Sequence, residues 1–175
     1  MPVPEPNEDL AAQIAQLRRY ARALTGDRWA ADDLVQDTLE RACSRWRLWA
    51  AGSDLRAWLF TLMHNLFIDE RRRAMRQAAE PLDPDGPEPS SSALATEHAL
   101  DLQRCLMRLP EEQREVLLLV TLQDLGYAEV ARLTGVPVGT VMSRLSRARA
   151  RLRELMDEPA PASTGTVRGS LRRMK

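Results

Sequence analysis

The chain has 175 residues, 44% of them hydrophobic, and its 25 basic and 25 acidic residues give a formal net charge of +0 at pH 7. This length allows one domain or two small ones, with enough hydrophobic residues for a buried core. No hydrophobic run approaches the roughly 20 residues that a membrane-spanning helix needs. The first residues also lack the basic and then hydrophobic pattern of a signal peptide. We therefore expect a cytoplasmic protein without membrane insertion.

The residues that usually carry chemistry are scattered along the chain. Cys43 and Cys105 have no second Cys or His at metal-ligand spacing, which predicts no metal site and no disulfide framework. Each cysteine is expected to be a small buried side chain. His64 and His98 are isolated, and we find no Gly-rich phosphate loop and no nucleophile beside a base. The sequence predicts neither an enzyme nor a cofactor.

Residues 8–76 contain three segments with helical periodicity. Hydrophobic residues recur at three- and four-residue spacing in three segments: 10–24, 28–46 and 55–76. Gly26 is expected to end the first helix, and Asp27 to cap the second. No alternating hydrophobic pattern demands a strand. We predict a small helical domain.

The composition changes at residues 77–92, which contain four prolines and three consecutive serines. From Gln77 to Asp101 there are six acids and no Arg or Lys, which is typical of a flexible anionic linker. Helical periodicity returns over residues 93–157, and residues 158–175 are expected to form a disordered tail. The predicted fold class is therefore all-α, with two small helical domains joined by a flexible acidic linker.

The segment from Tyr127 to Arg147 has the spacing of a helix-turn-helix. Ala131 supplies the small residue where two helices cross, and Gly135, four residues later, can adopt the left-handed turn. Val141, six residues after Gly135, anchors the second helix. An ordinary helical hairpin is the alternative interpretation.

Five arginines follow in the ten residues from 144 to 153, with no acid among them. On a helical wheel they flank a hydrophobic stripe that consists of Val141, Leu145, Ala148, Leu152 and Leu155. Arg144, Arg147 and Arg151 lie on one side of the stripe, and Arg149 and Arg153 on the other. A helix that carries charge of only one sign in a neutral chain is more typical of a phosphate-facing surface than of a merely solvated helix.

Seven of the eight aromatic residues lie between Tyr20 and Phe67, next to the basic run "HNLFIDERRR" that starts at His64. Aromatic and basic residues together are typical of single-stranded DNA binding. The alternative is packing, which we expect for Trp46, Trp58 and Phe67. His64 is expected to have a surface or packing role.

Three motifs carry a family resemblance. "DDLVQDTLERA" (32–42) resembles the core-polymerase-binding segment of sigma-70 family factors, and "LRAWLFTLMHNLFIDERRR" (55–73) resembles their promoter −10 segment. The segment from 109 to 155 is similar to their −35-binding domain. The order and the acidic linker resemble the extracytoplasmic-function (ECF, group 4) sigma factors, over roughly residues 10–156.

The resemblance implies a sigma factor that binds core RNA polymerase and initiates transcription of a restricted, stress-responsive regulon. Its partners would be the β′ clamp helices and β flap of polymerase, promoter DNA and an anti-sigma factor. Docking on the clamp helices is implied for Asp33, Leu34, Gln36 and Asp37, with Leu34 shared with the hydrophobic core. The loop from Trp49 to Asp54 would hold a flipped −10 base.

The DNA contacts implied by the resemblance lie in both domains. Near the −10 element they are Trp49, Asn65, Arg71, Arg72 and Arg73. At the −35 element Thr140 and Arg144 would hold phosphates, while Ser143, Ser146 and Arg147 would face bases. Met142 departs from the family, whose members often have Lys or Arg there. The alternatives are a sigma-like or plain helix-turn-helix regulator acting without core polymerase, and a sigma mimic that sequesters a regulator.

Overall fold

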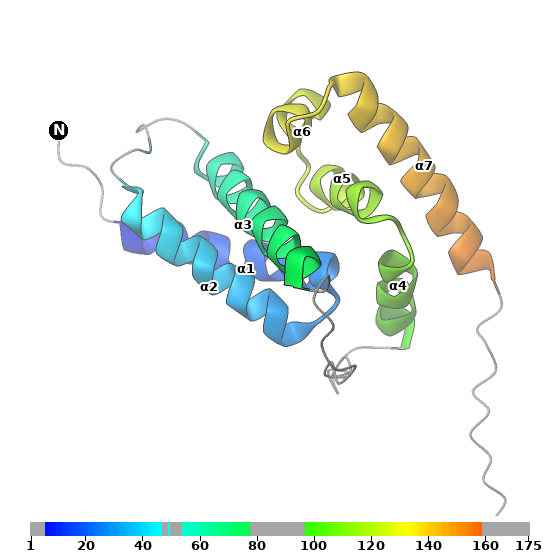
Figure 1. The fold of residues 1–175 in the computed structure, drawn as a ribbon, viewed down its shortest axis with the longest axis horizontal. Helices are drawn as coiled ribbons and strands as arrows, with labels where there is room; N and C mark the ends of the chain where they lie inside the picture. Colours follow the sequence, from blue (N-terminus) through cyan, green and yellow to red (C-terminus); the bar gives the residue numbers. More distant parts are fainter. Residues whose placement is uncertain (1–5, 47–48, 50–53, 78–96, 159–175) are drawn as a thin grey trace, which may run out of the picture.

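The computed structural model describes residues 6–46, 49, 54–77 and 97–158 of the chain. Regular structure in these residues is entirely helical, which confirms the predicted all-α class (Figure 1). The helices are α1 (Pro6–Thr25), α2 (Arg28–Ser44), α3 (Leu55–Gln77), α4 (Glu97–Met107), α5 (Glu111–Thr121), α6 (Tyr127–Thr134) and α7 (Val138–Asp157). The predicted linker and tail, and residues 50–53 of the predicted base-holding loop, lie outside the described residues apart from Gln77 and Glu158.

The corner between α1 and α2 forms as its sequence predicts. Gly26 adopts φ +77° and its N–H donates to the Arg22 carbonyl at 3.0 Å, which ends α1. The Asp27 carboxylate then accepts a hydrogen bond from the Ala30 N–H at 2.7 Å and caps α2. A left-handed glycine followed by an N-cap reverses the chain within two residues. The corner brings α2 back along α1.

Helices α1, α2 and α3 form one three-helix group around a dense core (Figure 1). The rings of Tyr20 from α1 and Phe60 from α3 meet edge to face, with centroids 5.2 Å apart. Trp46 is buried, as expected, and its ring lies 4.9 Å from Trp49 and 6.3 Å from Trp58. These aromatic contacts connect the end of α2 to the start of α3. They fix the direction of α3, which carries the predicted −10 residues.

One packing expectation is wrong. Cys43 is exposed on α2, and Cys105 is only partly buried on α4, where its thiol contacts the Leu155 carbonyl at 3.6 Å. Cys43 follows the buried Ala42, so its side chain has rotated away from the core side of the helix. The residue type alone does not fix that orientation.

The second group, α4–α7, contains the predicted helix-turn-helix in α6 and α7. Gly135 adopts φ +69°, and the Val136 N–H donates to the Ala131 carbonyl at 3.2 Å across the turn. Val130 and Val141 are fully buried. Before α6, the Gly126 N–H donates to the Glu129 carboxylate at 2.8 Å. The local spacing of small, glycine and aliphatic residues therefore produces the motif that it predicts.

The two groups pack against each other, with α1 against α4 and α5, and α3 against α6 (Figure 1). Gln103 on α4 donates to the Arg22 carbonyl at 3.1 Å, and Arg19 on α1 donates to the Leu122 carbonyl at 3.5 Å. A side chain on Gly26 would overlap Met107 of α4. The contact therefore joins segments that lie far apart in the chain.

Candidate polymerase and promoter interfaces

An acidic surface lies on α2. Asp33, Gln36 and Asp37 are exposed there, and the Gln36 amide donates to Glu40 at 3.0 Å. Leu34 is 0% exposed and belongs to the hydrophobic core. The expected place of Leu34 in the core is therefore confirmed, and its side chain offers no surface to a partner in this structure. The remaining three residues form one polar face.

Glu70 of α3 extends this acidic surface and was missed by sequence reasoning. Partial burial raises the pKa of the Glu70 carboxyl, and the nearby Asp37 and Asp33 carboxylates raise it further, while Arg73 opposes them. Like charges gathered in this way disfavour ionisation. Glu70 lies on a different helix from Asp33 and Asp37, so local spacing does not reveal the cluster. The only signal is an acid directly before three arginines.

The predicted −10 residues on α3 are not equally available. Asn65, Arg72 and Arg73 are exposed, whereas Arg71 is half-buried and forms an ion pair with Glu111 of α5. Trp49 is partly buried and packs on the Trp46 ring. Three of the five predicted residues are therefore exposed, and Arg71 is already paired with an acid.

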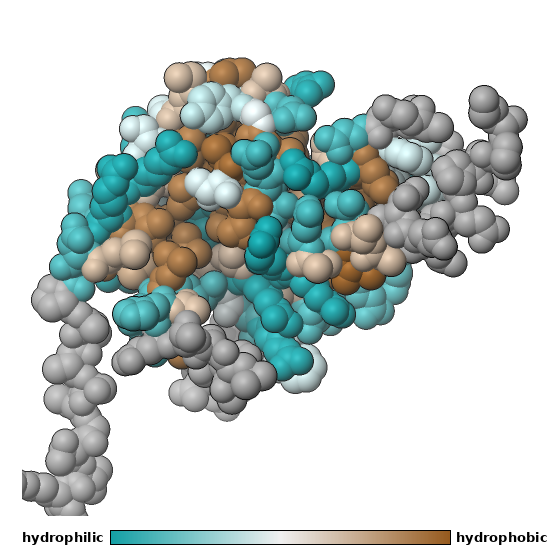
Figure 2. All heavy atoms as spheres, turned by 180° about the vertical axis from the view of Figure 1, so that it is seen from behind, coloured by the Kyte–Doolittle hydropathy of each residue, from teal (hydrophilic) through white to brown (hydrophobic). Residues whose placement is uncertain are grey.

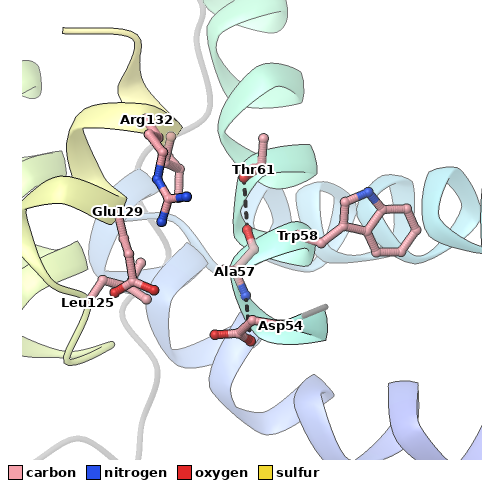
Figure 3. A pocket seen from close by; sticks show the side chains of 8 residues that line it. Asp54, Ala57, Trp58, Thr61, Leu125, Glu129 and Arg132 are labelled. Carbon is pink, nitrogen blue, oxygen red and sulfur yellow. Dashed lines mark hydrogen bonds between the residues drawn. The ribbon is translucent and has the colours of Figure 1, made fainter. Parts of the chain in front are cut away.

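A cleft between α3 and α6 holds part of the same surface. One part of it is lined by Asn65 and Arg72 of α3 together with Arg132 of α6. Figure 3 shows the other part, where Glu129 and Arg132 face Ala57 and Thr61, whereas Trp58 points away from α6. There the Thr61 hydroxyl donates to the Ala57 carbonyl at 2.8 Å. Helix α6 therefore covers part of the face of α3 that carries the predicted −10 contacts.

A buried polar pair lies at the centre of the contact between the two groups. The His64 imidazole of α3 contacts the Glu115 carboxylate of α5, and both side chains are almost fully buried. Burial raises the pKa of Tyr20 well above its ordinary value, and Glu115 raises it further while Arg114 lowers it. Burial also lowers the pKa of Arg114, which donates to the Leu106 and Leu109 carbonyls. Of the two roles expected for His64, surface or packing, the structure shows packing, with a partner that the sequence did not indicate.

The predicted −35 surface lies along α7, opposite the buried Val141, Leu145, Ala148 and Leu155. Ser143, Ser146 and Arg147 are exposed, and Thr140 is partly exposed. Arg144 is bound instead by Glu112 of α5, with 2.5 Å between nitrogen and oxygen. Seen from behind, hydrophilic surface runs along the edge formed by α7 (Figure 2). The structure thus brings all five predicted −35 residues onto one helix and leaves three of them exposed.

Comparison with known families gives two matches in the same order as the two helical groups. Residues 10–64 match the model of the sigma2 domain of PhyR, and residues 99–152 match that of sigma-70 region 4. The first range contains α2 and the N-terminal part of α3, as far as His64, and the second contains the helix-turn-helix. The docking residues of α2 and the −35 residues of α7 therefore lie in matched regions, whereas Asn65, Glu70 and the three arginines that follow it lie beyond the end of the first match.

Relatives match across both helical groups. The chain is 36% identical over 151 residues to the ECF RNA polymerase sigma factor EcfG of Rhodopseudomonas palustris, covering 85% of this chain and 83% of that protein. It is 40% identical over 144 residues to SigM of Mycobacterium tuberculosis, covering 81% and 71%. These relatives place the chain in the sigma-70 class of transcription factors. Within that class, it belongs to the ECF RNA polymerase sigma factors.

Solved structures agree with this assignment. RpoE of Bartonella quintana, solved in complex with the anti-sigma factor NepR, has a TM-score of 0.74 at 32% identity, covering 85% of this chain and 94% of that one. CnrH, solved with the cytosolic domain of CnrY, has a TM-score of 0.62 at 27% identity, covering 86% of each chain.

None of the helices in the described residues has the length and the hydrophobicity that a membrane span requires.

Proposed function

We propose that this ECF sigma factor acts in the cytoplasm, binds core RNA polymerase through α2 and recognises −10 and −35 promoter elements through α3 and α7. The observation that carries the proposal is α7, which buries one side and exposes Ser143, Ser146 and Arg147 on the other. A helix-turn-helix reads bases from such an exposed second helix. The regulon would be restricted and stress-responsive, in keeping with the family.

The decisive test is transcription in vitro with purified core polymerase, the full chain and genomic DNA. The proposal predicts promoter-specific transcripts only when both proteins are present. Transcripts that do not depend on the added chain would exclude it. A plain helix-turn-helix regulator would instead bind a site without polymerase, which a binding assay on the same DNA detects.

The polymerase surface predicts an effect of charge on holoenzyme formation. Asp37→Asn should weaken binding to core polymerase roughly tenfold, because a hydrogen bond to a charged group contributes about 1.5–3 kcal/mol. Glu70→Gln should act in the same direction, since its carboxyl belongs to the same acidic cluster. Fluorescence anisotropy of the labelled chain with core polymerase measures both. Asp157→Asn, an exposed acid at the end of α7, is the matched control; equal effects at all three positions would argue against a docking surface on α2.

The arginines of α7 predict two different effects on promoter binding. Arg147→Ala should lose about 1–3 kcal/mol at one −35 base pair and relax the preference there, because Arg reads guanine with two hydrogen bonds. Arg149→Ala should give a smaller loss at every sequence, since a phosphate contact carries no base preference. Holoenzyme binding to promoters with single −35 substitutions separates these outcomes. An Arg147→Ala variant with an unchanged base preference would remove Arg147 from the readout.

The domain contact and the acidic linker add two further proposals. Because α6 covers part of the α3 cleft, we expect the two groups to separate when α3 and α7 bind their promoter elements. The linker would then span the domains and follow the basic RNA-exit channel of polymerase. Replacing Glu80, Asp83, Asp85 and Glu88 with amides should reduce transcription without unfolding either domain. Unchanged initiation would leave the linker a role in solubility only.

An anti-sigma partner is proposed from the similar structures, since RpoE and CnrH were solved with NepR and CnrY. The rival is a sigma mimic, because PhyR of Bartonella quintana, an anti-anti-sigma factor, shares the fold at 18% identity and a TM-score of 0.55. A mimic needs no DNA-reading surface, yet Ser146 and Arg147 remain exposed on α7. This difference favours the sigma factor.

A further inference from the structure

The outer face of α7 carries hydrophobic surface that neither phosphate binding nor the hydrophobic core explains. Met142 is 53% exposed and Val138 is 42% exposed. Residues four apart on a helix lie one above the other, so the two side chains form one short stripe. Ser146 continues this stripe by one more turn. The stripe lies at the N-terminal end of the helix, which is the part that contacts base edges in a helix-turn-helix.

The chemistry of the stripe limits what it can recognise. Methionine has no N–H or O–H donor, and its thioether is a weak acceptor. It therefore cannot replace the hydrogen bonds by which Arg or Lys reads guanine. Thymine offers the other kind of feature in the major groove, a C5-methyl group that is read by apolar contact. A long flexible thioether can adapt to the position of such a methyl.

The neighbouring side chains do not cover Met142, which stays 53% exposed. The Ser143 hydroxyl donates to the Thr140 carbonyl at 3.0 Å, which holds it against its own helix. Arg144 is drawn toward α5 by Glu112. Gly139, one residue after Val138, has no side chain, and an added Cβ would meet open space. The stripe of Val138 and Met142 is therefore open to solvent.

We propose that Met142, with Val138 beside it, contacts the C5-methyl group of a thymine in the −35 element and selects for thymine at that position. The inference rests on the proposed function, because it requires α7 to enter the major groove of the −35 DNA. It assigns a specificity role to the residue that departs most clearly from a basic recognition surface. Hydrophobic contact replaces a hydrogen bond at this base pair.

The test replaces each −35 thymine, on either strand, with deoxyuridine, which removes only the methyl group. Binding of the holoenzyme, core polymerase with the full chain, is measured on a promoter identified by transcription in vitro. One substitution should weaken binding about fourfold, the effect of uncovering one methyl-sized group. Met142→Ala should bind the thymine and deoxyuridine promoters equally. Met142→Leu should keep the difference between them.

Met156→Ala is the matched control, because Met156 is an equally exposed methionine at the far end of the same helix. This variant should keep the full sensitivity to deoxyuridine. A −35 element without a sensitive thymine, or a sensitivity that survives in Met142→Ala, would overturn the inference while the sigma function stands. The absence of promoter-specific transcription would instead overturn the proposed function itself. Unchanged thermal unfolding of Met142→Ala excludes misfolding as the cause.

Discussion

Glu115→Ala is expected to release the two helical groups from each other. Glu115 and His64 are both buried and contact each other across the interface. Removing one partner of a buried pair typically costs about 3–5 kcal/mol, because the other is left buried and uncompensated. Separation of the groups, proposed above, would return His64 to water. The stability lost in Glu115→Ala is therefore at most the free energy that holds the two groups together.

The distance between the groups measures this effect. A dye on Cys43 of α2 and a second dye on a cysteine introduced at Met156 of α7 report it by energy transfer, after Cys105→Ser. Both attachment points are exposed. The parent chain should show one short distance, and Glu115→Ala a longer and broader distribution. His64→Ala should have a similar effect, and the double variant should add little, since the two side chains act as a pair.

Glu154→Ala, which removes an exposed carboxylate from α7, should leave the distance unchanged. If Glu115→Ala also leaves it unchanged, the His64–Glu115 pair does not hold the groups together. Circular dichroism should show the same helical content in every variant, because α3 and α5 each retain their own core contacts. The separated form should also bind single-stranded DNA more tightly, since the α3–α6 cleft would open.

Phe60→Ala is expected to destabilise the α1–α3 group by about 3–5 kcal/mol. Phe60 is 1% exposed, and its ring meets the Tyr20 ring edge to face. The substitution removes the largest buried side chain of α3 that lies on this seam, together with an aromatic pair worth about 0.5–1.5 kcal/mol beyond the area that it buries. The neighbouring Leu59 and Met63 are fully buried and cannot move far to fill the space.

Urea unfolding followed by circular dichroism measures this loss. The unfolding of the α1–α3 group should move to lower urea concentration than in the parent chain. Met75→Ala is the control on the same helix, because Met75 is 64% exposed and its loss should change stability by less than about 0.5 kcal/mol. A loss below about 1 kcal/mol for Phe60→Ala would mean that the Tyr20–Phe60 seam is not tightly packed.

The features that the sequence predicted well depend on residues close together in the chain. The corner at Gly26 and Asp27 and the turn at Gly135 follow from the backbone preferences of single residues. The all-α class and the buried face of α7 follow from the period of the hydrophobic residues. Each of these signals acts within one or two helical turns.

The features that it missed depend on residues far apart. Glu115 meets His64, and Glu111 meets Arg71, only because the two groups pack together. Glu112 occupies Arg144 across two helices of one group. A helical wheel places a charge on a face but does not identify the opposite charge that another helix brings to it. For the same reason, the acidic cluster around Glu70 was not visible in the spacing of α3.

Gly26 has a consequence for how this protein can vary. The residue ends α1 in a left-handed conformation, and the missing side chain also leaves room for Met107 of α4. Asn tolerates the conformation but brings a Cβ that overlaps Met107. A smaller residue at 107 would remove the overlap but not the backbone strain of most residues at 26. Because the overlapping atoms lie toward the end of a flexible side chain, Met107 can move away at small cost. In a library randomised at both positions, the left-handed backbone should therefore be the main limit at position 26, so that Gly and Asn are recovered there with many different residues at 107.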